Sequence, residues 1–399
     1  MERKAFIILG FVMFLSMTGY GIVLPSLPYV AERLGLSSVE MGTLITGWAF
    51  AQFLTTPLWG RLIDRFGKKP ILFFGLFGFA VAFLLIIFAQ SFGQLLLARI
   101  IGAILSSGTV PAALTIVADS TGDGERKNAM AKMGAVNGLG FLCGPALGGV
   151  FAPLGINAPF IAASLLAMFS LPFVWFFIKE PSKEGNTEKT PSLFRSLYLA
   201  AQAGYRELYI LTFGKALAAS SLFGMLGYFM IDRFEAAAAE VSLGFSVFAG
   251  GSAFVQFFLL NHMYRLKTDN WIAQFGFLMA ILGYLFIAIA VGLPMVILGC
   301  ALVGLGTACI KPTVISLLAK QDQMGQGITM GLDQAIDSLG RILGPLIGGV
   351  LFGLHIMLPF ISSSIICVIM LVLVAVNGRK SVGVWSISRH ENEKHAVKN

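Results

Sequence analysis

Long apolar stretches without a charged residue dominate this chain. No Asp, Glu, Lys or Arg occurs in residues 5–31, 70–98, 133–178 or 270–310. A helix crosses the hydrocarbon core with about 20 such residues, and only a helix satisfies its own backbone there unless strands close into a barrel. The alternating segments of about ten residues that a barrel requires are missing. The pattern therefore predicts twelve transmembrane helices, at residues 5–29, 41–60, 71–90, 94–118, 128–151, 156–178, 208–230, 241–260, 271–290, 294–318, 328–352 and 357–377.

Composition supports a membrane protein and excludes two other classes. Of 399 residues, 57% are hydrophobic and 12% charged, about half the ~25% charge of soluble domains. A soluble enzyme and a disordered chain are thus excluded. The first span is too long to be a signal peptide. The four cysteines fall within spans without metal-ligand spacing, so we expect a multi-pass protein of the cell membrane, a functional monomer in the lipid bilayer, with no metal and no cofactor.

The basic residues predict the orientation. Lys and Arg number 28 against 20 acidic residues, a net charge of +8. Most of them lie before the first span or in loops on the same side, whereas Arg33 and Arg233 fall on the other side. Because cytoplasmic loops are enriched in Lys and Arg, both termini are expected in the cytoplasm. Nucleic-acid binding is not needed to explain the excess.

The chain also contains an internal repeat at an offset of 200 residues. The polar stretch 179–207 predicts a cytoplasmic linker between two six-helix halves, 1–178 and 208–378, followed by a tail at 379–399. Parallel repeats of this kind are found in transporters. Glycines on one helix face permit close packing and proline bends a helix, so the motif indicates either packing alone or a seam on which the halves rock. The repeated motif consists of Gly140, Gly144, Pro145, Gly148 and Gly149 in the first half and of Gly340, Gly344, Pro345, Gly348 and Gly349 in the second. In the same way, Glu40 recurs as Glu240.

The loop after the second span reads GRLIDRFGKKP over residues 60–70. It resembles the signature of the major facilitator superfamily, and the glycine–proline motif resembles the antiporter motif of its proton-coupled exporters. The resemblance extends over the whole chain and is greatest to the twelve-span multidrug and tetracycline-type drug:proton antiporters. It implies an all-α fold of two pseudo-symmetric six-helix halves. It also implies proton-coupled export of small amphiphilic compounds, such as antibiotics, by rocker-switch alternating access.

In this family the signature loop latches the two halves together when the protein opens outward. The second-half loop, residues 261–268, lacks the aspartate and the glycines, so an asymmetric latch is expected. Lys68 and Lys69 have an alternative role to the latch, which is only to fix the orientation of the chain in the membrane. The predicted latch comprises Gly60, Asp64, Arg65, Gly67 and Lys68, with Asp119 and Arg126 in the next cytoplasmic loop and Asp333 as a further partner.

Ionisable residues inside spans are the candidates for coupling, because each costs at least ~2.5–3.5 kcal/mol to insert. Arg99 matches the arginine of the family's span-four motif, which is implicated in proton handling; the alternative is a structural cation satisfied by carbonyls. Asp333, Asp337 and Arg341 recur every four residues, so Asp337 and Arg341 are close enough to pair. Many related antiporters have an acid in the first span, which this chain lacks, so Asp337 is the first candidate for the proton site. A satisfied structural pair is the alternative.

Two further lysines and several polar side chains are candidates for a substrate cavity. Lys215 and Lys311 would favour an anionic or zwitterionic substrate, or one of them would titrate; alternatively both snorkel to the cytoplasmic surface. Amphiphile export and export of an anionic, zwitterionic or lipid-like metabolite thus both stay open. No HExxH, phosphate-loop or GxSxG motif occurs, so an enzyme is not expected. The remaining predicted cavity residues are Tyr20, Trp48, Gln52, Asn137, Tyr228 and Gln256.

Overall fold

The computed structural model describes residues 3–121, 123–178, 180, 206–319 and 326–380, and within these ranges the secondary structure is helical. The predicted linker 179–207 and tail 379–399 lie almost entirely outside the described residues. The helices are α1 (Arg3–Arg33), α2 (Ser38–Phe66), α3 (Lys68–Phe88), α4 (Phe92–Ser106), α5 (Thr109–Asp119), α6 (Asp123–Phe151), η1 (Ala152–Leu154), α7 (Ala158–Phe177), α9 (Arg206–Phe234), α10 (Ala238–Phe254), the π-helical η2 (Val255–Leu259), α11 (Leu260–Leu266), α12 (Asp269–Ala288), α13 (Leu293–Ala319), α14 (Gln326–Leu354) and α15 (Leu358–Lys380).

The all-helical membrane fold is confirmed. Eleven of the described helical segments are long and apolar enough to cross a membrane, and each coincides with a predicted span. The remaining predicted span, 41–60, lies in α2, which has 29 residues but a more polar sequence. The fourth span is broken into α4 and α5 at Ser107 and Gly108, and the eighth passes through α10, η2 and α11. Neither irregularity was predicted from the sequence; at the first, Pro111 on α5 has no N–H to donate to the Ser107 carbonyl four residues before it.

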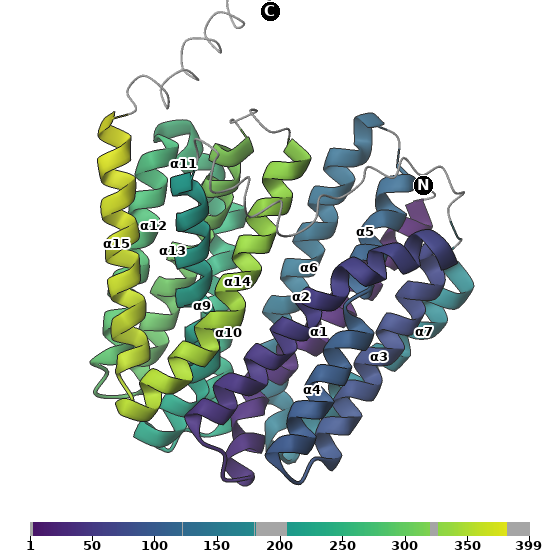
Figure 1. Cartoon of the computed structure of the whole chain (residues 1–399), viewed down its shortest axis with the longest axis horizontal. Helices are drawn as coiled ribbons and strands as arrows, with labels where there is room; N and C mark the ends of the chain where they lie inside the picture. Colours follow the sequence, from purple (N-terminus) through teal and green to yellow (C-terminus); the bar gives the residue numbers. More distant parts are fainter. Residues whose placement is uncertain (1–2, 122, 179, 181–205, 320–325, 381–399) are drawn as a thin grey trace, which may run out of the picture.

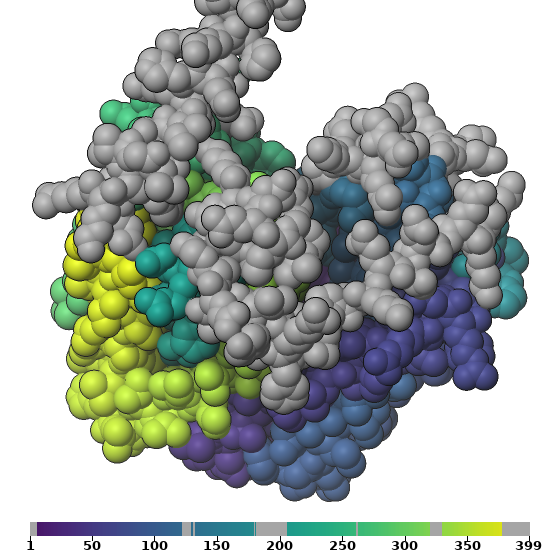
Figure 2. All heavy atoms as spheres, turned by 45° about the horizontal axis from the view of Figure 1, so that its top comes forward, coloured from purple at the N-terminus to yellow at the C-terminus, as the bar shows by residue number. Residues whose placement is uncertain are grey.

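The helices gather into two groups, α1–α7 and α9–α15, which lie close together at one end and diverge toward the end where both chain termini emerge (Figure 1). Figure 2 views the molecule obliquely from that second end, with the blue helices of the first group on the right and the green and yellow helices of the second group on the left. Helices α2 and α10, at corresponding positions of the repeat, start alike: Glu40 accepts the Ser37 N–H and Glu240 the Ala237 N–H, each at 2.8 Å.

The glycine–proline motifs hold the long helices of each group together. In the first group α6 packs on α1, where Gly144 faces the backbone of Gly21 and the Thr18 carbonyl. In the second group α14 packs on α9 in the same manner, with Gly344 against the Leu217 carbonyl and Ser220. A side chain at either glycine would overlap this backbone, so close approach explains the glycines here.

The two groups touch through α2 with α14 and α6 with α10. Gly149, the last glycine of the first motif, faces Ser242, and its counterpart Gly349 faces the Ser38 carbonyl. Thr46 Oγ1 also donates to the Ile342 carbonyl at 2.7 Å. The last glycine of each motif is therefore part of a seam between the groups, in addition to the packing inside each group.

Candidate functional site

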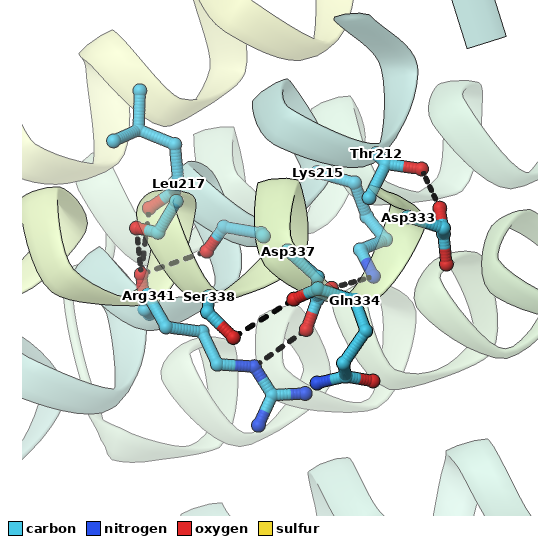
Figure 3. A network of polar contacts seen from close by, with 11 residues as sticks. Thr212, Lys215, Leu217, Asp333, Gln334, Asp337, Ser338 and Arg341 are labelled. Atoms are coloured by element: carbon cyan, nitrogen blue, oxygen red, sulfur yellow. Dashed lines mark hydrogen bonds and ion pairs between the residues drawn. The ribbon is translucent and has the colours of Figure 1, made fainter. Parts of the chain in front are cut away.

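A buried ionic cluster joins α9 to α14 (Figure 3). Asp337 on α14 accepts from Lys215 Nζ at 2.8 Å through Oδ1 and from Arg341 Nε at 2.7 Å through Oδ2. The Asp337 side chain is 4% exposed and that of Lys215 10%, whereas that of Arg341 is 55% exposed. One cation is thus enclosed with the carboxylate, and the other reaches it from an open side.

Two more charged residues belong to this cluster. Asp333, one turn before Asp337, accepts from the Thr212 hydroxyl at 2.6 Å (Figure 3). Lys311 on α13 is within electrostatic range of Lys215, Asp337, Arg341 and Asp333, and its side chain is exposed. The cluster therefore contains three basic and two acidic side chains, contributed by α9, α13 and α14.

Arg99 on α4 lies apart from this cluster, in the first group of helices. It is 3% exposed, and its guanidinium lies 4.5 Å from the centroid of the Trp48 ring. Within the described residues Arg99 has no hydrogen bond or ion pair, and its buried Nε is without a partner. Its contact with the Trp48 ring is a cation–π interaction. Carbonyl groups do not satisfy it here.

An aromatic band runs from Arg99 across to the second group. Trp48 contacts Tyr20 with ring centroids 6.1 Å apart, and Tyr20 contacts Phe141 at 6.2 Å. Phe141 in turn meets Phe223 on α9 at 6.2 Å, in an edge-to-face arrangement. Rings from both groups are thus in contact along this band, which links Trp48 beside Arg99 to Phe223 on α9.

The other predicted cavity residues have different surroundings. Asn137 lies one turn from Phe141 on α6, and its buried Oδ1 has no partner. Gln52 is half-buried on α2, and Gln256 is exposed in η2 with its amide on Ser252. Tyr228 lies at the seam, where its hydroxyl donates to the Leu36 carbonyl at 2.9 Å. Tyr29 makes a matching bond to the Ala236 carbonyl at 2.8 Å.

The signature loop forms its contacts inside the first group. Lys68 pairs with Asp119 at 2.5 Å, while Arg65 lies against the Phe66 ring. Asp64 is exposed and makes no ion pair among the described residues. Gly60 has open space around it, and Gly67 adopts a positive φ of 98° where α2 meets α3. Asp333 lies beside Thr212 instead, and the Arg126 side chain is outside what the structure describes.

Sequence reasoning missed three partners in these sites. Glu180 caps α3, because its carboxylate accepts the N–H groups of Lys68 at 2.6 Å and Lys69 at 2.7 Å. Lys215 was expected in the cavity but not on Asp337, and Thr212 was not singled out. The repeat shows that α9 and α14 correspond to α1 and α6, but it does not specify which of their side chains meet.

Comparisons with known proteins identify the family of this fold. The family model "Major Facilitator Superfamily" matches residues 9–321 and 208–398. The chain belongs to the major facilitator superfamily. As such it is a multi-pass membrane protein, with the family's all-helical fold. Within the described residues no group of three or more His, Cys, Asp or Glu side chains could hold a metal ion.

Superfamily members with similar sequences or structures include drug-resistance proteins. Multidrug resistance protein 2 of Bacillus subtilis is 26% identical over 92% of this chain and 94% of its own length. Quinolone resistance protein NorA of Staphylococcus aureus is 26% identical over 90% and 92%. Among solved structures, the human organic anion transporter MFSD10 aligns with a TM-score of 0.65 at 23% identity, covering 94% of this chain and 99% of that one. The nucleoside transporter NupG aligns with a TM-score of 0.78 at 12% identity over 93% and 99%.

Proposed function

We propose that this protein is a proton-coupled antiporter that exports small amphiphilic compounds by alternating access. The observation that supports this proposal best is that α14 combines the candidate proton site with residues of the seam. This helix contains Asp337, its cation Arg341, and the seam residues Ile342, Pro345 and Gly349 that face the other group. A change in the charge of Asp337 would therefore act on the same helix that closes the molecule.

The proton cycle follows from the contacts of Asp337. In this conformation two cations hold its carboxylate, so gaining a proton requires at least Arg341 to move away. With both termini in the cytoplasm, the two groups diverge toward the inside (Figure 1), and we assign the paired carboxylate to the state that has released its proton. The substrate then binds, and protonation from outside follows in the outward-open state. The names of the relatives, multidrug and quinolone resistance proteins, support drugs as the exported class.

Purified full-length protein in liposomes tests this proposal. We expect an imposed pH gradient, acidic on the side opposite the termini, to drive movement of a fluorescent amphiphilic dye and a counter-movement of protons. A protonophore, which collapses the pH gradient, should abolish the dye movement. Dye movement that ignores the gradient and the protonophore would contradict proton coupling, while proton uptake with no dye movement would contradict the substrate class.

A second candidate, export of an anionic or zwitterionic compound, is favoured by the unpaired cation Arg99 and by exposed Lys311. Replacement of either residue by glutamine is then expected to weaken transport of an anionic dye more than that of a neutral analogue of the same shape. One charge-assisted contact corresponds to about 1.5–3 kcal/mol, roughly ten- to a hundred-fold in affinity. Equal effects on both dyes would contradict this candidate and leave amphiphile export in place.

A further inference from the structure

An open groove lies on the outer side of the second group, where the eighth span passes through η2. It has a volume of about 420 Å³ and is lined by Phe254, Leu259, Met263, Trp271, Phe275 and Leu305, with His262 and Lys267 at its margin. Its walls belong to α10, η2, α11, α12 and α13, of which α10 with η2, α12 and α13 are candidate membrane spans. The groove therefore begins within the depth of the bilayer, where acyl chains are the surrounding solvent, and continues to the loop at Lys267.

The repeat explains why this space is open. In the first group the corresponding position is occupied by Trp59, whose Nε1 donates to the Ile104 carbonyl at 2.6 Å. Its ring lies so close to Gly108 that a Cβ there would be 2.9 Å away. At the offset of 200 residues stands Leu259, in a helix that is π-helical at this turn. A smaller side chain on a locally widened helix thus leaves a space that the first group fills itself.

The end of the groove near the termini is positively charged. Lys267 follows α11, and its ammonium lies 5.0 Å from the centroid of the Trp271 ring, which stacks on Phe275 at 5.4 Å. Arg265 is nearby and exposed, and the acid of this loop, Asp269, starts α12. A tryptophan and a lysine at a helix end are typical of the membrane–water interface. The two cations outnumber the single acid.

We propose that this groove binds one anionic phospholipid, whose acyl chain lies where Trp59 lies in the first group and whose phosphate contacts Lys267. The apolar walls match a hydrocarbon chain, and the positive end matches an anionic headgroup, which surface cations near a membrane attract. Asp337 and Arg99 are not among the residues that line the groove, so the proposal does not depend on the transport function proposed above.

Native mass spectrometry of the purified full chain with added phosphatidylglycerol or phosphatidylcholine tests the proposal. We expect the wild type to retain one phosphatidylglycerol after the other lipids are removed. Leu259→Trp, which supplies the indole of the first group, should lose it, whereas the volume-conserving control Leu259→Met should keep it. Lys267→Gln should reduce phosphatidylglycerol affinity about five-fold, as expected for one cation near an anionic headgroup, with no change for phosphatidylcholine.

Retention of phosphatidylglycerol by Leu259→Trp would overturn the groove as the site. Equal retention of the two lipids by the wild type would overturn the choice of an anionic headgroup. Should Leu259→Trp fail to fold, the comparison of Lys267→Gln with Arg61→Gln decides, because Arg61 is also an exposed cation but lies on α2 in the first group. A matching loss of phosphatidylglycerol in both would then overturn the proposal, and a loss in Lys267→Gln alone would support it.

Discussion

Asp337→Asn is expected to reduce gradient-driven export to near background while substrate exchange without a gradient continues. Asparagine keeps the size and one acceptor oxygen of Asp337 but cannot exchange a proton. Intramembrane carboxylates are the usual members of proton relays in transporters. The measurement is dye transport in liposomes with and without an imposed pH gradient, on the same preparation, so that coupling and substrate binding are read separately.

A loss of stability must be distinguished from a loss of coupling. The variant leaves Lys215 without its carboxylate, which we expect to cost about 3 kcal/mol, the lower end for breaking a buried pair, because Arg341 keeps solvent contact. The double variant Asp337→Asn, Lys215→Gln removes the enclosed unpaired cation. It should regain thermal stability in detergent without regaining gradient-driven export.

Asp333→Asn is the matched control on the same helix. Its amide oxygen can still accept from Thr212, which donates at 2.6 Å in the wild type. We expect this variant to retain most gradient-driven export. If Asp333→Asn loses coupling while Asp337→Asn retains it, the proton site has been assigned to the wrong carboxylate. Retention of coupling in both would remove the cluster from the proton pathway.

The sequence predicted the features of this fold that repeat along the chain. Charge-free stretches located the spans, and the offset of 200 residues anticipated that Gly144 and Gly344 occupy equivalent places. These features depend on one helix at a time, or on the copy of one helix in the other half. Solvation by lipid and the period of a helix are sufficient to specify them.

Features that depend on contacts between helices could not be predicted in the same way. The pairing of Lys215 with Asp337 depends on the rotation of α9 against α14, which the spacing of residues on either helix does not specify. Glu180 follows α7, more than a hundred residues from the loop that it caps. The difference between Trp59 and Leu259 is visible in the sequence, but only packing shows that one fills a space and the other leaves it open.

Gly42→Val is expected to abolish transport without unfolding either half. Gly42 on α2 lies directly against the Pro345 carbonyl and the backbone of Leu346 on α14, so any side chain at this position would overlap the other group. The nearest atoms are all on α14, and packing inside the first group is left unchanged. The seam therefore cannot close, and the populations shift toward the state that is open at this end, because the substitution destabilises only the closed one.

Spin labels at Glu32→Cys and Asp232→Cys measure this shift, in a chain whose native cysteines are replaced by serine. Both positions are exposed near the closed end, on α1 and α9, and correspond at the offset of 200 residues. Gly42→Val should lengthen the distance between the labels. Gly138→Val, on α6 with open space around the glycine, should leave both distance and transport unchanged. If Gly42→Val loses transport but keeps the label distance of the wild type, then Gly42 does not act by permitting the seam to close. A longer distance with transport intact would show that alternating access does not require the seam.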